Sequence, residues 1–351
     1  MNKLKVAIIF GGMSTEHDVS IISGINVISN MNEDKYEKYC IYIDKDGIWY
    51  EYDYKNDNNV YKVGDDIKNI TKIDNYLEKL KNVDVVFPVL HGKHGEDGSI
   101  QGICEFIKKP YVGCGILASS VGMDKVYSKV VFEKAGINQT KSVYIKSFND
   151  NFIYVDEKFN EQICNMDEVI QIAENKLKYP VFVKPSNSGS SVGVKKAINK
   201  NELSEAIKNA AKYDVKILIE EGIIGKEVEC AVLGNEEVLA STVGQIVPAE
   251  EFYSFDAKYN NQESYTKIPA DISDDLQEEI KKLAVKAFKA IDGKGLSRVD
   301  FFVEDNTNKI YLNEINTLPG FTSISMYPSL MKSVGIEYDE LIDKVINLAL
   351  N

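Results

Sequence analysis

The sequence has no long apolar run and no excess of positive charge. No apolar stretch in its 351 residues approaches the roughly 20 residues that a membrane-spanning helix needs. Its start, "MNKLKVAIIF", lacks the longer apolar segment and small-residue cleavage site of a signal peptide, so we expect a cytoplasmic protein without membrane contacts. The formal net charge of −13 argues against nucleic-acid partners, because clustered positive charge supplies most of the attraction to nucleic acid.

Cysteine pairs and the common phosphate-binding motifs are also missing. The cysteines are odd in number and form no Cys-x-x-Cys pair, which argues against zinc sites and disulfides: Cys40, Cys104, Cys114, Cys164 and Cys230. We expect them to be buried free thiols. The sequence has no G-x-x-x-x-G-K-[ST] motif, and no G-x-G-x-x-G follows the first strand, so any phosphate site must be of another kind.

The residues that are present predict a globular α/β and α+β protein of two or three domains. Hydrophobic residues make up 44% and charged residues 27% of the chain, which is typical of a packed core. Near the start, the strand "KVAIIF" leads through a glycine turn into an apolar helical repeat, as in α/β units. With "YCIYI", "VDVVFPVL" and a helix over 100–108, the first ~115 residues predict a small parallel α/β domain.

The later part of the chain predicts an α+β region with antiparallel hairpins. Strands are expected at "KSVYIKSF", "VFVKP", "VGVKKA", "VKILIEE", "VECAVLG", "VLASTVGQI", "LSRVDFFVE" and "KIYLNEIN". Helices are expected over 167–178, 202–212, 274–291 and from Tyr338 onward.

The strongest chemical pattern lies in the last two of these strands. Side chains at i and i+2 of a strand share a face, which places Arg298 with Asp300 and Glu314 with Asn316. The intervening "DNTN" is a turn signal, so we expect the strands to pair as a hairpin and to gather all four side chains.

Two carboxylates and an amide oxygen are suitable ligands for a hard cation such as Mg²⁺, which completes its shell with substrate phosphates. A surface salt-bridge network is the alternative. We expect Phe302 and Leu312 to lie on the same face, which implies burial and favours the metal, because unpaired buried carboxylates are costly.

Three lysines and one glycine-rich loop form a second pattern. Lys184 ends an apolar strand directly before "PSNSGSSVGV", which is either a surface hairpin turn or a loop that closes over phosphates. Lys125 stands at a helix start in "VGMDKV", and Lys258 lies in "FDAKY". A lysine on a buried strand is rarely structural.

These motifs together resemble a known family. In order along the chain they are "FGGMSTEHDVS", "HGKHGEDGSIQG", "GMDK", "VKPSNSGSSVGV", "FYSFDAKY", "SRVDFF" and "NEINTLPGFTSISMYP". Over nearly its whole length the chain resembles the D-alanine–D-alanine ligases of the ATP-grasp superfamily. The resemblance implies an N-terminal α/β domain over 1–120, a central ATP-grasp lobe over 121–213 and a C-terminal lobe over 214–351, the two lobes enclosing ATP.

The resemblance also implies a reaction and its partners. ATP would phosphorylate the carboxylate of one D-alanine, and the amine of a second would attack the acyl phosphate, giving D-alanyl-D-alanine for peptidoglycan precursors. Two Mg²⁺ ions, or Mn²⁺, and a homodimer are typical of similar enzymes. The loop after "VKP" would close over the triphosphate, opening and closing in each turnover.

The family's functional residues match this sequence position by position. The implied catalytic residues are Glu16, Ser190, Tyr259, Arg298 and Ser325. The implied nucleotide-binding residues are Lys125, Lys184, Ser191, Glu220, Glu221, Ile223, Glu227 and Lys258. The implied metal ligands are Asp300, Glu314 and Asn316, and the further substrate-site residues are His91, Glu96 and Met326.

Several of these residues have a structural alternative. Glu16 would bind the ammonium of the first D-alanine and form a triad with Ser190 and Tyr259, but a first-turn glutamate also complements a helix dipole. His91 would lie near substrate carboxylates, or could be a core histidine with satisfied hydrogen bonds. Glu96 would orient the triad, and His94 receives no role.

The second substrate is less sharply defined by the sequence. Ser325 would bind its carboxylate, and Met326 would line its methyl pocket, where relatives that make D-alanyl-D-lactate or D-alanyl-D-serine often have a basic or polar residue. The apolar Met326 favours D-alanine. Two alternatives remain: a ligase selective for D-serine or D-lactate, and a non-catalytic ATP- or amino-acid-binding module. The intact set around Arg298 argues against the second.

Overall fold

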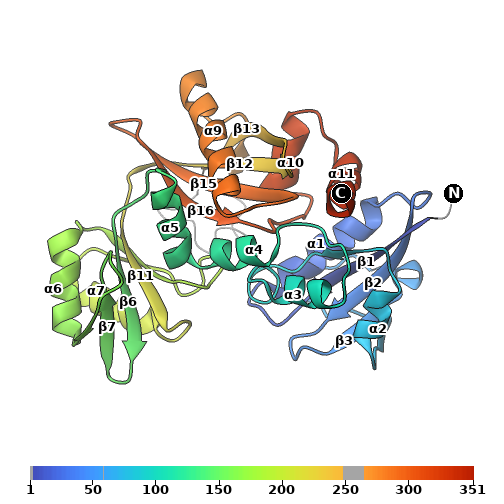
Figure 1. The fold of residues 1–351 in the computed structure, drawn as a ribbon, viewed down its shortest axis with the longest axis horizontal. Coiled ribbons are helices and arrows are strands. Elements are labelled where there is room, and N and C mark those ends of the chain that lie inside the picture. Colours follow the sequence, from blue (N-terminus) through green and yellow to red (C-terminus); the bar gives the residue numbers. More distant parts are fainter. Residues whose placement is uncertain (1–2, 58, 248–264) are drawn as a thin grey trace.

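The computed structural model describes residues 3–57, 59–247 and 265–351. Its strands form three separate sheets that follow one another along the chain. In Figure 1 the first sheet (blue) and the second (green to yellow) lie at opposite ends, and the third (orange) lies above and between them. The arrangement places a junction of all three units at the middle of the molecule.

The first sheet has the order β4-β3-β2-β1-β5. Its strands are β1 (Leu4–Gly11), β2 (Tyr36–Ile43), β3 (Trp49–Tyr52), β4 (Ile70–Lys72) and β5 (Val85–Pro88). Strand β1 pairs in parallel with β2 and β5, as expected, but β3 and β4 add to the edge antiparallel. The predicted parallel domain is therefore a mixed sheet, because the short connection between β2 and β3 allows antiparallel pairing.

The helices of the first unit include one from the far end of the chain. Locally they are α1 (His17–Asn30), η1 (Tyr54–Asn56), α2 (Tyr76–Lys81) and α3 (Ser99–Phe106). The predicted closing helix is α11 (Tyr338–Leu350), and it contacts β5 and α1 (Figure 1). Leu341 and Val345 of α11 are fully buried in one core with Ile8 and Phe10 of β1. The last helix thus completes the core of the first sheet.

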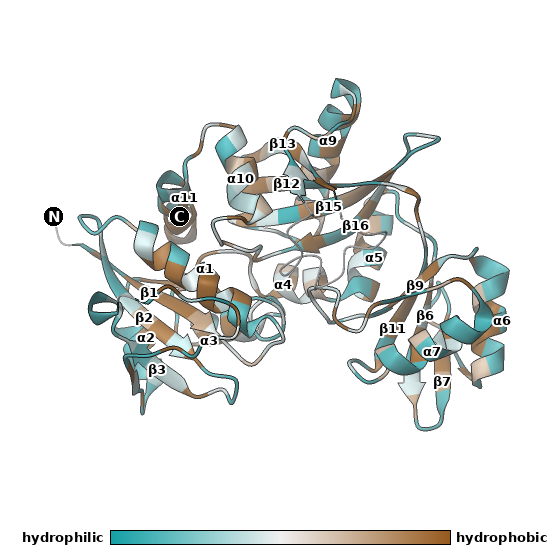
Figure 2. Ribbon diagram, turned by 180° about the vertical axis from the view of Figure 1, so that it is seen from behind, coloured by the Kyte–Doolittle hydropathy of each residue, from teal (hydrophilic) through white to brown (hydrophobic). Residues whose placement is uncertain are grey.

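The second sheet has the order β10-β9-β11-β6-β7-β8. Its strands are β6 (Ser142–Phe148), β7 (Asn151–Val155), β8 (Glu161–Cys164), β9 (Val181–Pro185), β10 (Lys195–Ala197) and β11 (Lys216–Glu221). Helices α6 (Met166–Lys176) and α7 (Lys200–Ala210) cover its apolar face, and their outer faces are hydrophilic (Figure 2). Only the end of the predicted strand "VGVKKA" is a strand, and the residues before it form turns.

The third sheet has the order β14-β13-β12-β15-β16 and is antiparallel throughout. Its strands are β12 (Gly225–Gly234), β13 (Val238–Val247), β14 (Tyr265–Lys267), β15 (Leu296–Glu304) and β16 (Ile310–Asn316). Helix α9 (Asp274–Ala290) packs on one face, while α10 (Met326–Ser333) contacts β12 and β13.

Two helices join the three units. Helices α4 (Ile116–Met123) and α5 (Lys125–Lys134) lie between the sheets, where α4 contacts β16 and α5 contacts β11 (Figure 1). The expected boundary at 120/121 falls inside α4, and the one at 213/214 would detach β11 from its sheet. We therefore propose that the division between the second and third units lies between Glu221 and Gly225. In the described ranges, no helix has the length and apolarity needed to cross a bilayer.

Candidate active site

Strands β15 and β16 form the predicted hairpin. Arg298 is the cross-strand partner of Asn316, and Asp300 is the partner of Glu314. Partners in an antiparallel pair point to the same face, so the four side chains are neighbours as expected. The Asp300 carboxylate is buried and accepts a hydrogen bond of 3.0 Å from the Asn316 amide nitrogen.

A β-bulge directly beyond this group corrects one expectation. The register shifts between Asp300 and Phe301, so that Phe301 pairs with Leu312 and Asn313 is the extra residue. Leu312 is consequently buried with Phe301 in the core against α9, on the opposite face from Glu314. The prediction that Leu312 shares the metal face was wrong, because the sequence pattern assumed unbroken alternation. Asn313 instead reaches the Lys184 ammonium, 3.2 Å from its side-chain oxygen.

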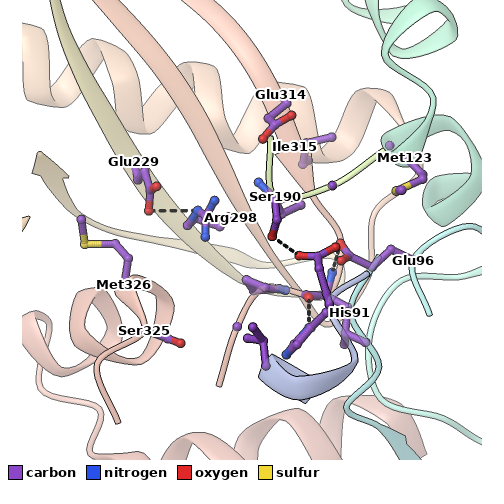
Figure 3. Close-up of a pocket in the computed structure, with 18 of the residues that line it drawn as sticks. His91, Glu96, Met123, Ser190, Glu229, Arg298, Glu314, Ile315, Ser325 and Met326 are labelled. Atoms are coloured by element: carbon purple, nitrogen blue, oxygen red, sulfur yellow. Dashed lines mark hydrogen bonds and ion pairs between the residues drawn. The ribbon is translucent and has the colours of Figure 1, made fainter. Parts of the chain in front are cut away.

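Arg298 is held by two carboxylates. Its Nε and Nη2 donate to the two oxygens of Asp300 at 2.8 and 2.7 Å. Its Nε also lies 2.9 Å from a carboxylate oxygen of Glu229 on β12 (Figure 3). Burial lowers the pKa of Arg298, but the charges of Asp300 and Glu229 outweigh it and raise that pKa well above the ordinary value. The guanidinium is thus a fixed positive charge at the cavity wall.

The predicted metal ligands are of the right chemistry for a hard divalent cation. Asp300 and Glu314 supply carboxylates from neighbouring strands, and Asn316 supplies an amide beside them. Among the described residues no three His, Cys, Asp or Glu side chains converge closely enough to hold a metal by themselves. A hard divalent cation can be held by one or two carboxylates and take its other ligands from water and phosphates.

The glycine-serine loop between β9 and β10 is a strained, self-supported turn. Ser190 and Ser191 both have left-handed backbones, with φ of 47° and 59°. The loop is braced internally by a hydrogen bond from the Val192 backbone N–H to the Gly189 carbonyl, and externally by one of 2.8 Å from Lys125 Nζ to the Ser188 carbonyl. Left-handed non-glycine residues store strain, and such residues cluster at ligand clamps.

The loop closes against Glu16. The Ser190 hydroxyl donates to a Glu16 carboxylate oxygen at 2.5 Å, and Glu16 is buried just before α1. A Cβ atom on Gly189 would lie 2.3 Å from the other Glu16 oxygen, and one on Gly92 would lie 2.4 Å from it. The Glu16 side chain makes no capping hydrogen bond to its helix. Tyr259, the third member of the expected triad, and Lys258 lie outside the described residues.

The predicted nucleotide-binding lysines are paired with carboxylates. Lys125 Nζ lies 3.2 Å from Glu314, and Lys184 Nζ lies 2.6 Å from Glu220. Glu220 is buried and also contacts Lys129 at 2.7 Å. Burial raises the pKa of Glu220, but the two lysines overcome this effect and lower it below the usual range. Lys125 thus links α5 to the third sheet, whereas the pair of Lys184 and Glu220 lies within the second sheet. Lys184 reaches the third sheet through Asn313.

The remaining predicted nucleotide-site residues surround this junction. Glu221 ends β11, Ile223 lies in the short connection to β12, and Glu227 is a half-buried residue of β12. Ser191 lies in the glycine-serine loop. Glu221 belongs to the second sheet and Glu227 to the third, and none of these four residues lines the cavity that holds most of the catalytic set.

His91 joins three segments through both ring nitrogens. Nδ1 lies 3.2 Å from the Leu318 carbonyl, and Nε2 lies 2.9 Å from the Ser23 hydroxyl. A carbonyl only accepts, so Nδ1 carries the proton and Nε2 accepts from Ser23, which in turn accepts from the Phe321 N–H. Burial lowers the pKa of His91 to about 4, so the ring is neutral. The core-histidine interpretation fits these bonds, although His91 also lines the cavity.

Glu96 is a buried carboxyl that accepts from two backbone N–H groups. One is that of Gly92 at 2.8 Å, and the other is that of Leu318 at 3.4 Å. Burial first, and then the neighbouring charge of Glu16, raise the pKa of Glu96 to about 8. Glu96 thereby ties the loop after β5 to the segment after β16, next to Glu16.

Most of the predicted catalytic set lines one cavity of about 160 Å³. Met326 and Ser325, at the start of α10, lie at one end, and Ser190, His91 and Glu96 lie at the other, with Arg298 between them (Figure 3). Ser325 accepts a hydrogen bond of 3.0 Å from the Thr322 N–H, and Met326 is buried. Of the predicted residues, the cavity is lined by Glu16, His91, Glu96, Lys125, Ser190, Arg298, Glu314, Asn316, Ser325 and Met326.

Four further residues were missed by sequence reasoning. Two had a readable signal: Glu229 follows Glu227 by two positions and so shares its strand face, and Lys129 follows Lys125 by one helical turn. Asn313 is exposed to the site only by the bulge, and Ser23 is a small polar residue on a buried helix face. Neither of these last two has a pattern that distinguishes it from its neighbours.

Two family models match the sequence. The family model described as D-ala D-ala ligase N-terminus matches residues 5–114, and the one described as D-ala D-ala ligase C-terminus matches residues 149–347. The chain belongs to the D-alanine–D-alanine ligase family. A D-alanine–D-alanine ligase from Acetivibrio thermocellus is 50% identical, with 99% of this chain and 96% of the relative covered. One from Clostridium novyi is 47% identical, with 99% and 98% covered.

Solved structures of this family have the same fold. The VanG D-Ala:D-Ser ligase from Enterococcus faecalis superposes with a TM-score of 0.83 at 37% identity, covering 99% of this chain and all of that one. The D-alanine-D-alanine ligase from Coxiella burnetii gives 0.81 at 32% identity, covering 100% of this chain and 94% of that one. The expected ATP-grasp fold is confirmed.

Proposed function

We propose that this ligase-family protein joins two D-alanine molecules to D-alanyl-D-alanine at the expense of ATP, as a building block of peptidoglycan. The carboxylate of the first D-alanine takes the terminal phosphoryl group, which gives an acyl phosphate and ADP. The amine of the second then attacks the carbonyl carbon, and phosphate leaves. A carboxylate oxygen is a poor leaving group, and phosphorylation removes that barrier.

The observation that supports this proposal best is the placement of Arg298 between two differently built ends of one cavity. The Glu16 end is acidic and suits an ammonium group, and the Ser325 end offers a hydroxyl beside an apolar side chain. Two small amino acids bound at these ends would meet over the guanidinium. Arg298 would stabilise the oxyanion of the tetrahedral intermediate, a contribution of about 3 kcal/mol for a donor in a dry site.

At the first-substrate end, Glu16 would bind the ammonium group of D-alanine. Ser190 holds the Glu16 carboxylate in place, so closure of the loop and binding of the substrate are coupled. We propose that Tyr259 completes this triad. Glu96 and His91 would act by fixing the surrounding backbone segments, since their polar atoms already bind Gly92, Leu318 and Ser23.

At the nucleotide end, Lys125, Lys184 and Lys258 would contact phosphates. Glu220 and the backbone at Glu221 and Ile223 would face adenine, Glu227 would face the ribose, and Ser191 would lie over the triphosphate. The divalent cation, for which we propose Mg²⁺ at two sites with Mn²⁺ as a substitute, would neutralise phosphate charge during transfer. Asp300, Glu314 and Asn316 would hold it.

We further propose a homodimer, as is typical of the family.

For the second substrate, D-alanine is favoured over D-serine. Met326 is buried and apolar at the Ser325 end, so a serine hydroxyl would be enclosed there without an evident partner, a cost of roughly 1–3 kcal/mol. The likeness to a D-Ala:D-Ser ligase keeps D-serine as the second candidate. Because apolar pockets reject an added hydroxyl only about 100-fold, some D-alanyl-D-serine should form at high D-serine.

The test is phosphate release from ATP with D-alanine alone, then with D-serine or D-lactate as competitor, across pH. We expect D-alanyl-D-alanine to dominate, increasingly so over D-lactate as pH rises and the amine is deprotonated. Met326→Arg should shift the products toward D-serine or D-lactate by adding a donor and a positive charge. A preference of the unaltered protein for D-serine at equal concentrations would replace the first candidate with the second. Absence of ADP formation under all conditions would favour a binding module.

A further inference from the structure

Three carboxylates lie in a row across three neighbouring strands. Glu229 of β12 is the cross-strand partner of Asp300 of β15, and Asp300 is the partner of Glu314 of β16. Like charges directly opposite each other in a sheet repel, so such a row needs cations beside it. Arg298 supplies one between Glu229 and Asp300, and Lys125 supplies another at Glu314.

Glu229 is not explained by stability. Its side chain is 6% exposed and lies at the cavity wall beside Arg298 (Figure 3). A buried ion pair is weak evidence for stability, because replacing the whole pair by apolar residues of similar volume is often neutral or stabilising. A carboxylate kept at this position therefore points to a role in the site.

Asp300 is expected both to hold the Arg298 guanidinium and to bind the divalent cation, and these two roles compete. A carboxylate has about four positions at which it can accept, and Arg298 Nε, Arg298 Nη2 and the Asn316 amide occupy three of them. A divalent cation that occupies an acceptor position of Asp300 weakens the hydrogen bonds that this carboxylate accepts from the guanidinium. Glu229 lies 2.9 Å from the same Nε and would stay beside the guanidinium if Asp300 turned toward the cation.

We propose that Glu229 is a positioning residue for Arg298: it keeps the guanidinium over the cavity and frees Asp300 for the divalent cation. The inference rests on the proposed function, because it assigns Arg298 to the oxyanion and Asp300 to the metal. In the Glu229→Gln variant, the Arg298 guanidinium would lose the Glu229 carboxylate and pair more strongly with Asp300. Cation binding would then be weaker and the chemical step slower, with the fold unchanged.

The experiment compares Glu229→Gln and Glu229→Asp with the unaltered protein, and uses Glu304→Gln, on the same sheet but at the far end of β15, as the matched control. Binding of Mn²⁺ in the presence of ADP is measured by the electron paramagnetic resonance of free Mn²⁺, which needs no turnover. The kcat and KM for D-alanine are measured from ADP formation at saturating Mn²⁺, and thermal midpoints are recorded for all variants.

For Glu229→Gln we expect weaker Mn²⁺ binding and a kcat lower by about 10–100-fold, the usual effect of removing a partner behind a metal ligand. The kcat loss should persist at saturating Mn²⁺, with the thermal midpoint unchanged or raised. Glu229→Asp keeps the charge and should recover part of both losses, and Glu304→Gln should behave as the unaltered protein.

Unchanged Mn²⁺ binding and kcat in Glu229→Gln would overturn the inference. So would a loss of activity in both Glu229 variants that tracks a lowered midpoint while Mn²⁺ binding is unchanged, since that is a structural role. If Glu229→Gln does not fold, Glu229→Met, which also removes the carboxylate at similar volume, takes its place, and normal Mn²⁺ binding and kcat in that variant overturn the inference. Failure of the proposed function is separate, because the unaltered protein itself would then form no ADP with D-alanine.

Discussion

The Ser190 hydroxyl donates a hydrogen bond of 2.5 Å to the carboxylate of Glu16, 174 positions earlier in the chain. One partner belongs to the glycine-serine loop after the second sheet's strand β9, and the other to the turn that follows the first strand. The sequence left open whether this loop is a surface hairpin turn or closes over a ligand site, and this contact distinguishes the two. The segment does not turn outward as a surface hairpin but lies over the cavity, against the residue expected to bind the first substrate.

The first prediction concerns the closeness of this approach. Gly189→Ala places a Cβ atom 2.3 Å from a Glu16 oxygen, so Glu16 must move and its bond to Ser190 is lost. Because small misplacements at a reacting centre can cost about 100-fold, we expect kcat to fall about that much. The matched control is Gly102→Ala on α3, where a Cβ meets nothing within 4 Å and helix propensity favours alanine. Equal activity of the two variants would contradict the closed arrangement, as would a collapse of the thermal midpoint in Gly189→Ala alone.

The second prediction concerns the carboxylate of Glu314. Glu314→Gln keeps the shape of the side chain but removes the charge that we expect to bind the divalent cation. ADP formation should nearly cease, because phosphate charge is no longer neutralised during transfer. The thermal midpoint should change little, since loss of the ion pair with Lys125 is offset by loss of the repulsion between Glu314 and the directly opposite Asp300. Normal turnover in a folded Glu314→Gln protein would refute the metal assignment.

The third prediction tests the bulge. Leu312 is 1% exposed and belongs to the core against α9, so Leu312→Ala should lower the free energy of unfolding by about 2–5 kcal/mol. Its KM for ATP should not change at temperatures well below the midpoint. Denaturant unfolding and steady-state kinetics measure the two effects. A large rise in KM with unchanged stability would instead place Leu312 on the metal face.

The fourth prediction concerns the pH dependence of stability at Glu96. Its pKa is raised from an ordinary 4.5 to about 8, so the folded protein binds a proton that the unfolded chain releases in this range. The stability contributed by this group is complete below pH 4.5 and is lost as pH rises through about 8. Glu96→Gln removes the titration and retains an oxygen that can accept from Gly92. The thermal midpoint of this variant should therefore rise relative to that of the unaltered protein between pH 5 and about 8, and the difference should then level off. A constant difference would contradict the raised pKa.

Much of the fold followed from local patterns. Period-2 and period-3.6 hydrophobicity predicted the strands β1, β9, β12 and β15 and the helices α6, α7 and α9 near their observed positions. The strands β3 and β4 and the helix α4 were missed. Both strands are short, with 4 and 3 residues, and α4 is apolar on several sides and so has no clear periodicity.

The site was predictable where its residues alternate on a regular strand. Arg298 with Asp300 and Glu314 with Asn316 required only the period of a β-strand and a turn between them. Glu16 and Ser190 required the family resemblance, because nothing local to either segment shows that they meet. Leu312 and Asn313 exchanged faces through one extra residue, and a bulge of this kind has no signature in "KIYLNEIN".

The position of α11 has a consequence for synthesis of the protein. The buried side chains of this helix fill the core of the first sheet, yet α11 leaves the ribosome only after both other sheets have been made. Domains usually fold in order from the N-terminus as they emerge. Here part of the apolar surface of the first sheet stays uncovered until α11 packs against β5 and α1. Assembly of the catalytic cavity is therefore a late event in the maturation of the nascent chain, and chaperone demand should be greatest for fragments that end before α11.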